Sequence, residues 1–297
     1  TASRNTAVGF CALRNNTTGG ANVALGYEAL CANTTGGQNI AVGNNALKNN
    51  TTGGVNIAVG FSALCRNTAG GFNIAIGDLA LCYNSSGTYN IAIGCRAMRN
   101  NSGGYGNIAV GAKALCYNTT GVRNIAIGFS ALQLNTTGNK NTVVGYNAMQ
   151  NSYFGGSANI AVGYKALSSQ GIGTTRANAN VAIGYCVGYS NTSGTNLVAV
   201  GNDALFRNTT GSNLVAVGNR ALACNTVGYK NTAVGINALQ YNTSGRDNTA
   251  VGFQSLRCNT TGTDNVAIGS FALQCNTTGR LNTAVGSSAL GKNTVAV

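Results

Sequence analysis

Residues 56–72 read NIAVGFSALCRNTAGGF, and two near copies follow directly: NIAIGDLALCYNSSGTY over 73–89 and NIAIGCRAMRNNSGGYG over 90–106. The glycine of the Asn-x-Ala-Val-Gly segment recurs every seventeen residues from Gly9 to Gly145. After steps of eighteen and twenty-one residues, the seventeen-residue spacing resumes at Gly184 and continues to Gly286. A short, fixed period along a chain predicts a solenoid, in which each repeat forms one coil.

Each repeat contains two apolar segments separated by residues typical of turns. The first alternates β-branched residues with alanine and ends in glycine, as in Ile74-Ala75-Ile76-Gly77, which favours a strand. The second holds Ala-Leu or Ala-Met and is followed by a turn signal such as Asn-Thr-Thr-Gly. Four or five residues are too few for a stable helix in water. We therefore expect an all-β fold, a parallel β-solenoid or β-roll of about seventeen coils.

The domain organisation follows from the repeat, because a single coil buries too little to fold alone and must share a core with its neighbours. We expect one repeat array over 1–297. Regular units cover 5–149, irregular units with loop insertions cover 150–190, regular units return over 191–292, and a partial unit occupies 293–297.

The first segment is apolar on both faces, because its β-branched side chains point one way and its alanines the other. We expect the β-branched face to fill the coil and the flat Ala/Gly face to meet another chain. The alternative is that alanine fills the narrow interior of a single-chain coil. Contact with another chain would give a symmetric homo-oligomer or a filament.

Composition narrows the function classes. Eighteen Lys and Arg against five acids give a net charge of +13, but the basic residues are scattered. They indicate solubility or contact with an anionic surface or glycan rather than specific nucleic-acid binding. No run of apolar residues is long enough to span a membrane. The acids are far apart and histidine is absent, so we expect no enzyme, no metal and no cofactor.

Repetition places each residue type in a column along the solenoid. The asparagine that precedes the first segment predicts a structural ladder of side-chain amides: Asn22, Asn39, Asn56, Asn73, Asn90, Asn107, Asn124 and Asn141. A glycan contact along this ladder is the functional alternative.

The Asn-Thr-Thr turns form a second column with two functional interpretations beside the structural one. They match the N-glycosylation acceptor sequence at Asn33, Asn118, Asn135, Asn208, Asn259 and Asn276. Their threonines would also repeat at strand spacing, as on the ice-binding face of some solenoid antifreeze proteins, at Thr34, Thr51, Thr119, Thr136, Thr209, Thr260 and Thr277.

Ten cysteines without a C-x-x-C motif or a histidine argue against a zinc site. Cys65 with Cys82, and Cys258 with Cys275, occupy equivalent positions in adjacent repeats. Two Cα atoms one strand spacing apart are within disulfide range. Each pair is therefore a disulfide or a column of free thiols that act as small apolar residues.

The regular period breaks between Gly145 and Gly184. The longer insertion predicts a loop that contains Ser168, Gln170, Ile172 and Arg176. Loops on a rigid scaffold often carry binding residues, and a tolerated insertion is the alternative.

The Asn-x-Ala-Ile-Gly unit, with its longer form NLVAVG at 196–201 and 213–218, resembles the head repeat of YadA-type trimeric autotransporter adhesins. The variant with Asn-Thr-Thr-Gly turns also resembles repeat regions of phage-type tail-fibre proteins. The resemblance implies a left-handed, trimeric β-roll at a cell or virion surface. We expect a structural or adhesive extracellular fibre protein. The alternatives are a subunit of an end-to-end stacked helical filament and an ice-binding solenoid.

Overall fold

The computed structural model describes residues 2–153, 156–169 and 177–294. Its regular elements are seventeen short parallel strands, so the all-β solenoid prediction is confirmed. The chain divides into two compact units, Thr1–Val144 and Gly145–Val297. The first unit contains β1 (Thr6–Val8), β2 (Val23–Leu25), β3 (Ile40–Val42), β4 (Ile57–Val59), β5 (Ile74–Ile76), β6 (Ile91–Ile93), β7 (Ile108–Val110), β8 (Ile125–Ile127) and β9 (Thr142–Val144). The second contains β10 (Ile160–Val162), β11 (Val181–Ile183), β12 (Leu197–Val200), β13 (Leu214–Val217), β14 (Thr232–Val234), β15 (Thr249–Val251), β16 (Val266–Ile268) and β17 (Thr283–Val285).

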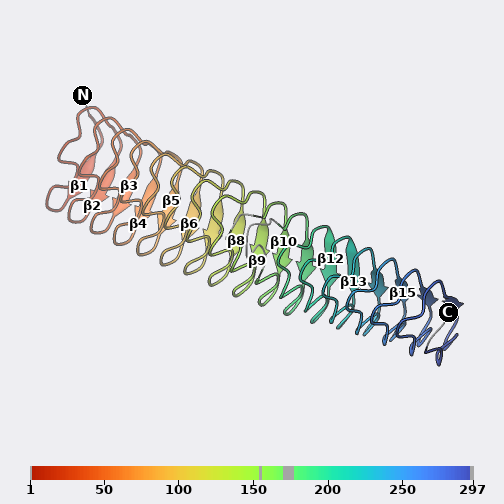
Figure 1. Cartoon of the computed structure of the whole chain (residues 1–297). Coiled ribbons are helices and arrows are strands. Elements are labelled where there is room, and N and C mark those ends of the chain that lie inside the picture. The colour runs from red at the N-terminus through yellow and green to blue at the C-terminus, as the bar shows by residue number, and fades with distance from the viewer. Residues whose placement is uncertain (1, 154–155, 170–176, 295–297) are drawn as a thin grey trace. The chain divides into compact units, whose positions relative to one another are not determined.

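Within each unit every strand pairs with the next one along the chain, so that the coils stack in register (Figure 1). In the first unit Ile40 lies beside Ile57, and Ala41 beside Ala58. In the second unit Thr232 lies beside Thr249. Equivalent residues of successive coils therefore form columns. We number the seventeen positions of a coil from its asparagine, with Asn56 as position 1 and Phe72 as position 17.

The backbone turns sharply after each strand. Gly60 at position 5 has a φ of 131°, which only glycine adopts without strain. Ser62 at position 7 and Leu64 at position 9 have φ of 52° and 50°, and Phe72 at position 17 has 60°. Three left-handed residues and one glycine thus close each coil.

The interior of a coil is narrow and is filled by alanine, leucine and asparagine side chains. Ala58 at position 3, Ala63 at position 8 and Leu64 at position 9 are fully buried, as are the amides Asn56 and Asn67. The β-branched side chains at positions 2 and 4 point outward, and Ile40 and Ile76 are 40% and 39% exposed. The expected orientation of the strand is therefore wrong, and the alternative, alanine inside the coil, is correct.

Candidate interaction surfaces

The structure places Asn22, Asn39, Asn56, Asn73, Asn90, Asn107, Asn124 and Asn141 in one buried column. The Oδ1 atom of Asn39 accepts hydrogen bonds from the backbone N–H of Asn56 at 3.0 Å and from its Nδ2 at 3.1 Å. Asn56 Nδ2 also donates to Gly70 O at 2.9 Å. In the second unit Leu197 and Leu214 interrupt the equivalent column. This ladder lies inside the coil and is structural.

The position-12 asparagines form a second buried ladder. Asn33, Asn118, Asn135, Asn208, Asn259 and Asn276 all have an exposure of 0%. Asn33 Nδ2 donates to Asn16 Oδ1 at 2.8 Å and to Gly36 O at 2.9 Å, and the other five make the equivalent pair of bonds. Both N–H groups of the amide are engaged, and no surface is left for a sugar. The folded coil therefore does not present these six acceptor sequences for glycosylation.

The threonine column next to this ladder is half-buried. Thr34 Oγ1 donates to Thr51 O at 3.0 Å, and Thr51, Thr119, Thr209, Thr260 and Thr277 donate to the next coil in the same way. These hydroxyl protons link coils rather than face solvent. Serine replaces threonine at Ser85, whose Oγ makes the same bond to Ser102 O at 2.8 Å.

The outward β-branched side chains at positions 2 and 4 form an apolar band, which we call the outer stripe. Every residue of the stripe is Val, Ile, Leu or Thr, so it carries no charge. In the first unit a mostly apolar hollow of about 300 Å³ lies on the stripe. Ile40, Ile57 and Ile74 line one side of it, and Gln38, Val55 and Phe72 line the other. In the second unit Ile160, Ile183 and Ile268 are 40–42% exposed. Each unit thus presents an uncharged and mostly apolar surface, with threonine at position 2 of some coils.

Aromatic side chains stack beside the outer stripe. Phe10 and Tyr27 at position 6 have ring centroids 5.2 Å apart. In the second unit Tyr164 lies between Tyr146, at 5.7 Å, and Tyr185, at 5.0 Å, with nearly parallel rings. Offset stacking of this kind stabilises neighbouring coils and widens the apolar surface at the edge of the stripe.

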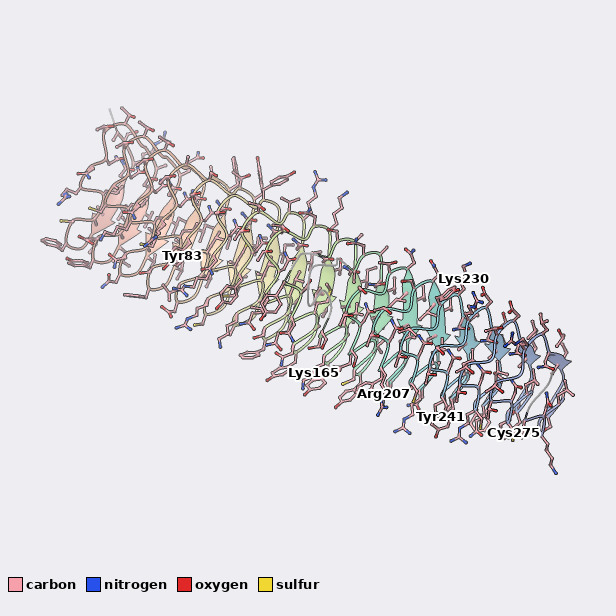
Figure 2. All side chains as sticks on the ribbon, viewed as in Figure 1. Tyr83, Lys165, Arg207, Lys230, Tyr241 and Cys275 are labelled. Atoms are coloured by element: carbon pink, nitrogen blue, oxygen red, sulfur yellow. The ribbon has the colours of Figure 1, made fainter. Side chains whose placement is uncertain are left out.

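The side chains at positions 7, 10 and 11 form a different surface, which we call the cationic face. In the first unit Lys48 Nζ lies 2.6 Å from Glu28 Oε2. The Arg66 guanidinium lies 4.5 Å from the ring centroid of Tyr83. Figure 2 shows Lys165, Arg207, Tyr241 and Cys275 along one edge of the second unit and Lys230 along the opposite edge.

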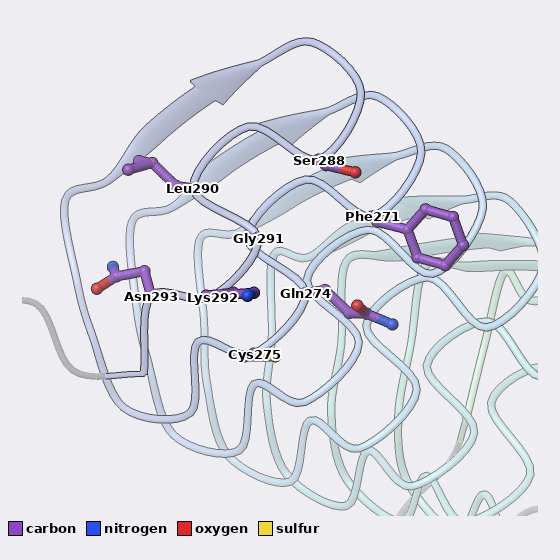
Figure 3. A pocket seen from close by; sticks show the side chains of 8 residues that line it. All are labelled: Phe271, Gln274, Cys275, Ser288, Leu290, Gly291, Lys292 and Asn293. Carbon is purple, nitrogen blue, oxygen red and sulfur yellow. The ribbon is translucent and has the colours of Figure 1, made fainter.

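Two hollows open on the cationic face of the second unit. One of about 500 Å³ is lined by residues that include Phe206, Arg207, Arg220 and Tyr241. The other, of about 770 Å³, lies at the last described coil (Figure 3). Phe271 and Gln274 stand on one side of it, and Leu290 and Lys292 on the other. At position 10, on the floor of each hollow, the residue is small, Ala223 in the first and Gly291 in the second.

All ten cysteines are free thiols. A hydrogen bond from the Cys82 thiol lowers the pKa of Cys65 to about 7, and the positive charges of Lys48 and Arg66 act in the same direction. The same hydrogen bond raises the pKa of Cys82. Burial and the neighbouring Cys275 raise the pKa of Cys258. The two predicted pairs are therefore columns of free thiols, and the pKa is lowered at Cys65 but raised at Cys82 and Cys258.

The insertion loop is only partly described. Ser168 is buried, and its backbone N–H donates to Lys165 O at 3.3 Å while its carbonyl accepts from Asn151 at 3.1 Å. This residue is thus part of the coil. Gln170, Ile172 and Arg176 lie outside the described residues.

The acidic side chains form no metal-binding cluster in the described ranges. Asp203 Oδ2 lies 4.0 Å from Arg220 Nε, and no three histidine, cysteine, aspartate or glutamate side chains there lie close enough to hold one ion. None of the described elements is a helix with the length and hydrophobicity needed to cross a bilayer.

The chain matches no protein-family model and no curated protein sequence. Sequence reasoning found the columns but missed the outer stripe and the hollow at Ala223. The sequence does contain a sign of this hollow: Ala223 is small, whereas the same column carries Tyr189, Phe206 and Gln240 in neighbouring repeats.

Proposed function

We propose that this protein is a structural element of an extracellular fibre, at a cell or virion surface, and that copies of it associate side by side through their outer stripes. The observation that carries the proposal is the uninterrupted, uncharged band of half-exposed β-branched side chains on each unit. Contiguous exposed apolar surfaces mark interaction sites. The role is mechanical and non-enzymatic.

The occupant that fits the stripe best is a second copy of the chain. The stripe repeats once per coil, so a partner can match it over many coils only if it has the same axial repeat. A second copy of the chain has the same axial repeat because it has the same sequence. Closed symmetry favours a small homo-oligomer, and the resemblance to YadA-type heads suggests a trimer.

The oligomeric state of the full chain tests the proposal. We expect light scattering and sedimentation to give a defined oligomer and the double variant Ile40→Lys/Ile76→Lys to give monomers. Both side chains are exposed in the single chain, so lysine leaves the coil intact while it places charge in the interface. Thr35→Lys/Thr52→Lys is the matched control, because these turn residues are also exposed. A monomeric parent protein, or an unchanged oligomer in the isoleucine double variant, would contradict the proposal.

Two alternatives give different outcomes. A filament stacked end to end would grow with concentration and would persist in the Ile40→Lys/Ile76→Lys variant. Ice binding through the threonine column would inhibit ice recrystallisation. The engagement of the threonine hydroxyls between coils does not favour the second alternative.

A further inference from the structure

The position-10 column of the second unit changes abruptly in size. Tyr189 and Phe206 stack with centroids 5.5 Å apart and planes 14° apart. The next residue in the column is Ala223, and the one after it is Gln240. Because alanine ends at its methyl group, the face of Phe206 that Tyr189 does not cover borders the 500 Å³ hollow.

The hollow has a floor and three walls. Ala223 and Cys224 form the floor. Phe206 and Arg207 come from the coil before it, and Gln240 and Tyr241 from the coil after it. Asp203 and Arg220, both at position 7, line the remaining side. The hollow thus occupies the space that a large position-10 side chain would fill between Phe206 and Gln240.

The thickness of this layer indicates the shape of a ligand. Coils repeat at about 4.8 Å, so the Phe206 and Gln240 layers are about 10 Å apart. One ring inserted between them lies at ordinary stacking distance from the open face of Phe206. A puckered, saturated ring is thicker than a planar one and fills this space better.

The charged side chains around the hollow indicate the chemistry of the ligand. Arg207 and Arg220 face the hollow with a single carboxylate, Asp203. The Arg220 side chain is 57% exposed and approaches Asp203 only to 4.0 Å, so its donors are available to a carboxylate. Gln240 is held by Arg257, whose Nε donates to Gln240 Oε1 at 2.9 Å. Asp203, Gln240 and the Tyr241 hydroxyl are suitable partners for sugar hydroxyls.

We propose that the hollow between Phe206 and Tyr241 binds an acidic sugar, a pyranose ring that stacks on Phe206 and places its carboxylate between Arg207 and Arg220. The site lies on the cationic face and not on the outer stripe. It therefore adds a recognition function that is independent of self-association.

The test measures binding of glucuronate to the full chain. Glucose, which has the pyranose ring but no carboxylate, and benzoate, which has a carboxylate but no pyranose ring, are the comparison ligands. We expect saturable binding of glucuronate by ligand-observed NMR, and binding of glucose and benzoate at least about tenfold weaker. Ala223→Phe restores a large residue to the column and is expected to abolish glucuronate binding. Cys116→Phe places the same side chain at position 10 of the first unit and is the matched control.

Arg220→Gln separates charge from shape. It is expected to weaken glucuronate binding about tenfold and to leave glucose binding unchanged. The Arg220 side chain is exposed, so we expect the variant to fold like the parent protein, and a thermal melt checks this. Absence of saturable binding, equal binding of the three probes, or glucuronate binding retained in Ala223→Phe would overturn the proposal. The oligomeric state of the same samples reports on the outer stripe separately.

Discussion

The leucine at position 9 combines complete burial with an unfavourable backbone conformation. Leu47 and Leu64 both have φ of 50° and are fully buried. A left-handed conformation costs an L-residue roughly 1–2 kcal/mol, and burial of a leucine contributes about 1.5–3 kcal/mol. The coil therefore tolerates the conformation because the side chain fills its interior. Nothing in the sequence signals it, since leucine rarely adopts these angles.

Position 17 offers a test of backbone strain at the surface. Lys140 is exposed and has a φ of 58°. Asparagine adopts this conformation more readily than lysine, so we expect Lys140→Asn to stabilise the protein by about 0.5–1 kcal/mol. Thermal denaturation followed by circular dichroism measures the change. Arg207→Asn is the control, because Arg207 is also exposed and its φ is not positive. Equal shifts in the two variants would show that strain is not the cause.

The buried amides should be far less tolerant. Asn56→Ala removes the acceptor for Asn73 N–H, at 3.0 Å, and the donor to Gly70 O, at 2.9 Å. Each buried group left without a partner costs about 1–3 kcal/mol, so we expect the two groups together to cost roughly 2–6 kcal/mol. Denaturant unfolding measures it, with the exposed Thr35→Ala as control. A loss below about 1 kcal/mol would mean that water replaces the ladder.

At the scale of the turn, two adjacent glycines have opposite roles. A Cβ atom on Gly104 would lie 2.4 Å from both Asn101 Oδ1 and Gly121 O, whereas one on Gly103 meets only Ser86 Oγ at 3.8 Å. We expect Gly104→Ala to disrupt coil stacking and lower the melting temperature by more than about 10 °C. Gly103→Ala should leave it unchanged or raise it slightly. Similar melting temperatures for the two variants would contradict the steric argument.

The thiol columns differ in their response to pH. Because the pKa of Cys65 is lowered to about 7, its alkylation rate should rise through a titration centred near pH 7. Cys258 has a raised pKa and should react only at more alkaline pH. Mass spectrometry after iodoacetamide pulses measures both rates in one sample. Cys82→Ala removes the hydrogen-bond donor and should shift the Cys65 profile to higher pH. Coincident profiles for Cys65 and Cys258 would refute the assignment.

The sequence was sufficient to predict the solenoid, its strands and its ladders, because the period alone places Asn39 beside Asn56. It was not sufficient to predict which side of the strand faces inward. Alternation distinguishes the Ala58 side from the Ile57 side, but only the width of the folded coil decides between them. The hollow at Ala223 could not be predicted either, because its walls come from the two neighbouring coils and form only when the coils stack.

For the whole molecule, one coil of seventeen residues is the segment that can be removed without changing the register of the rest. Deletion of 56–72 joins Val55 to Asn73 and leaves every later residue in its column. We expect this variant to fold with a change in melting temperature of at most about 5 °C, because stability in repeat proteins depends on nearest neighbours. Deletion of 56–64 moves the next residues out of register and should abolish the cooperative transition. Circular dichroism distinguishes the two, and equal damage would contradict a repeat-by-repeat architecture.

The enclosed amides also bear on how the protein ages. Asparagine deamidates when the backbone nitrogen of the following residue attacks the side-chain carbonyl carbon and expels ammonia, and water then hydrolyses the resulting succinimide to aspartate or isoaspartate. The attack requires a mobile side chain. The Asn67 amide is fixed on both sides, by Asn50 Oδ1 and Gly70 O, and cannot swing into that geometry. The hydrogen bonds that join the coils therefore also slow the deamidation of these asparagines.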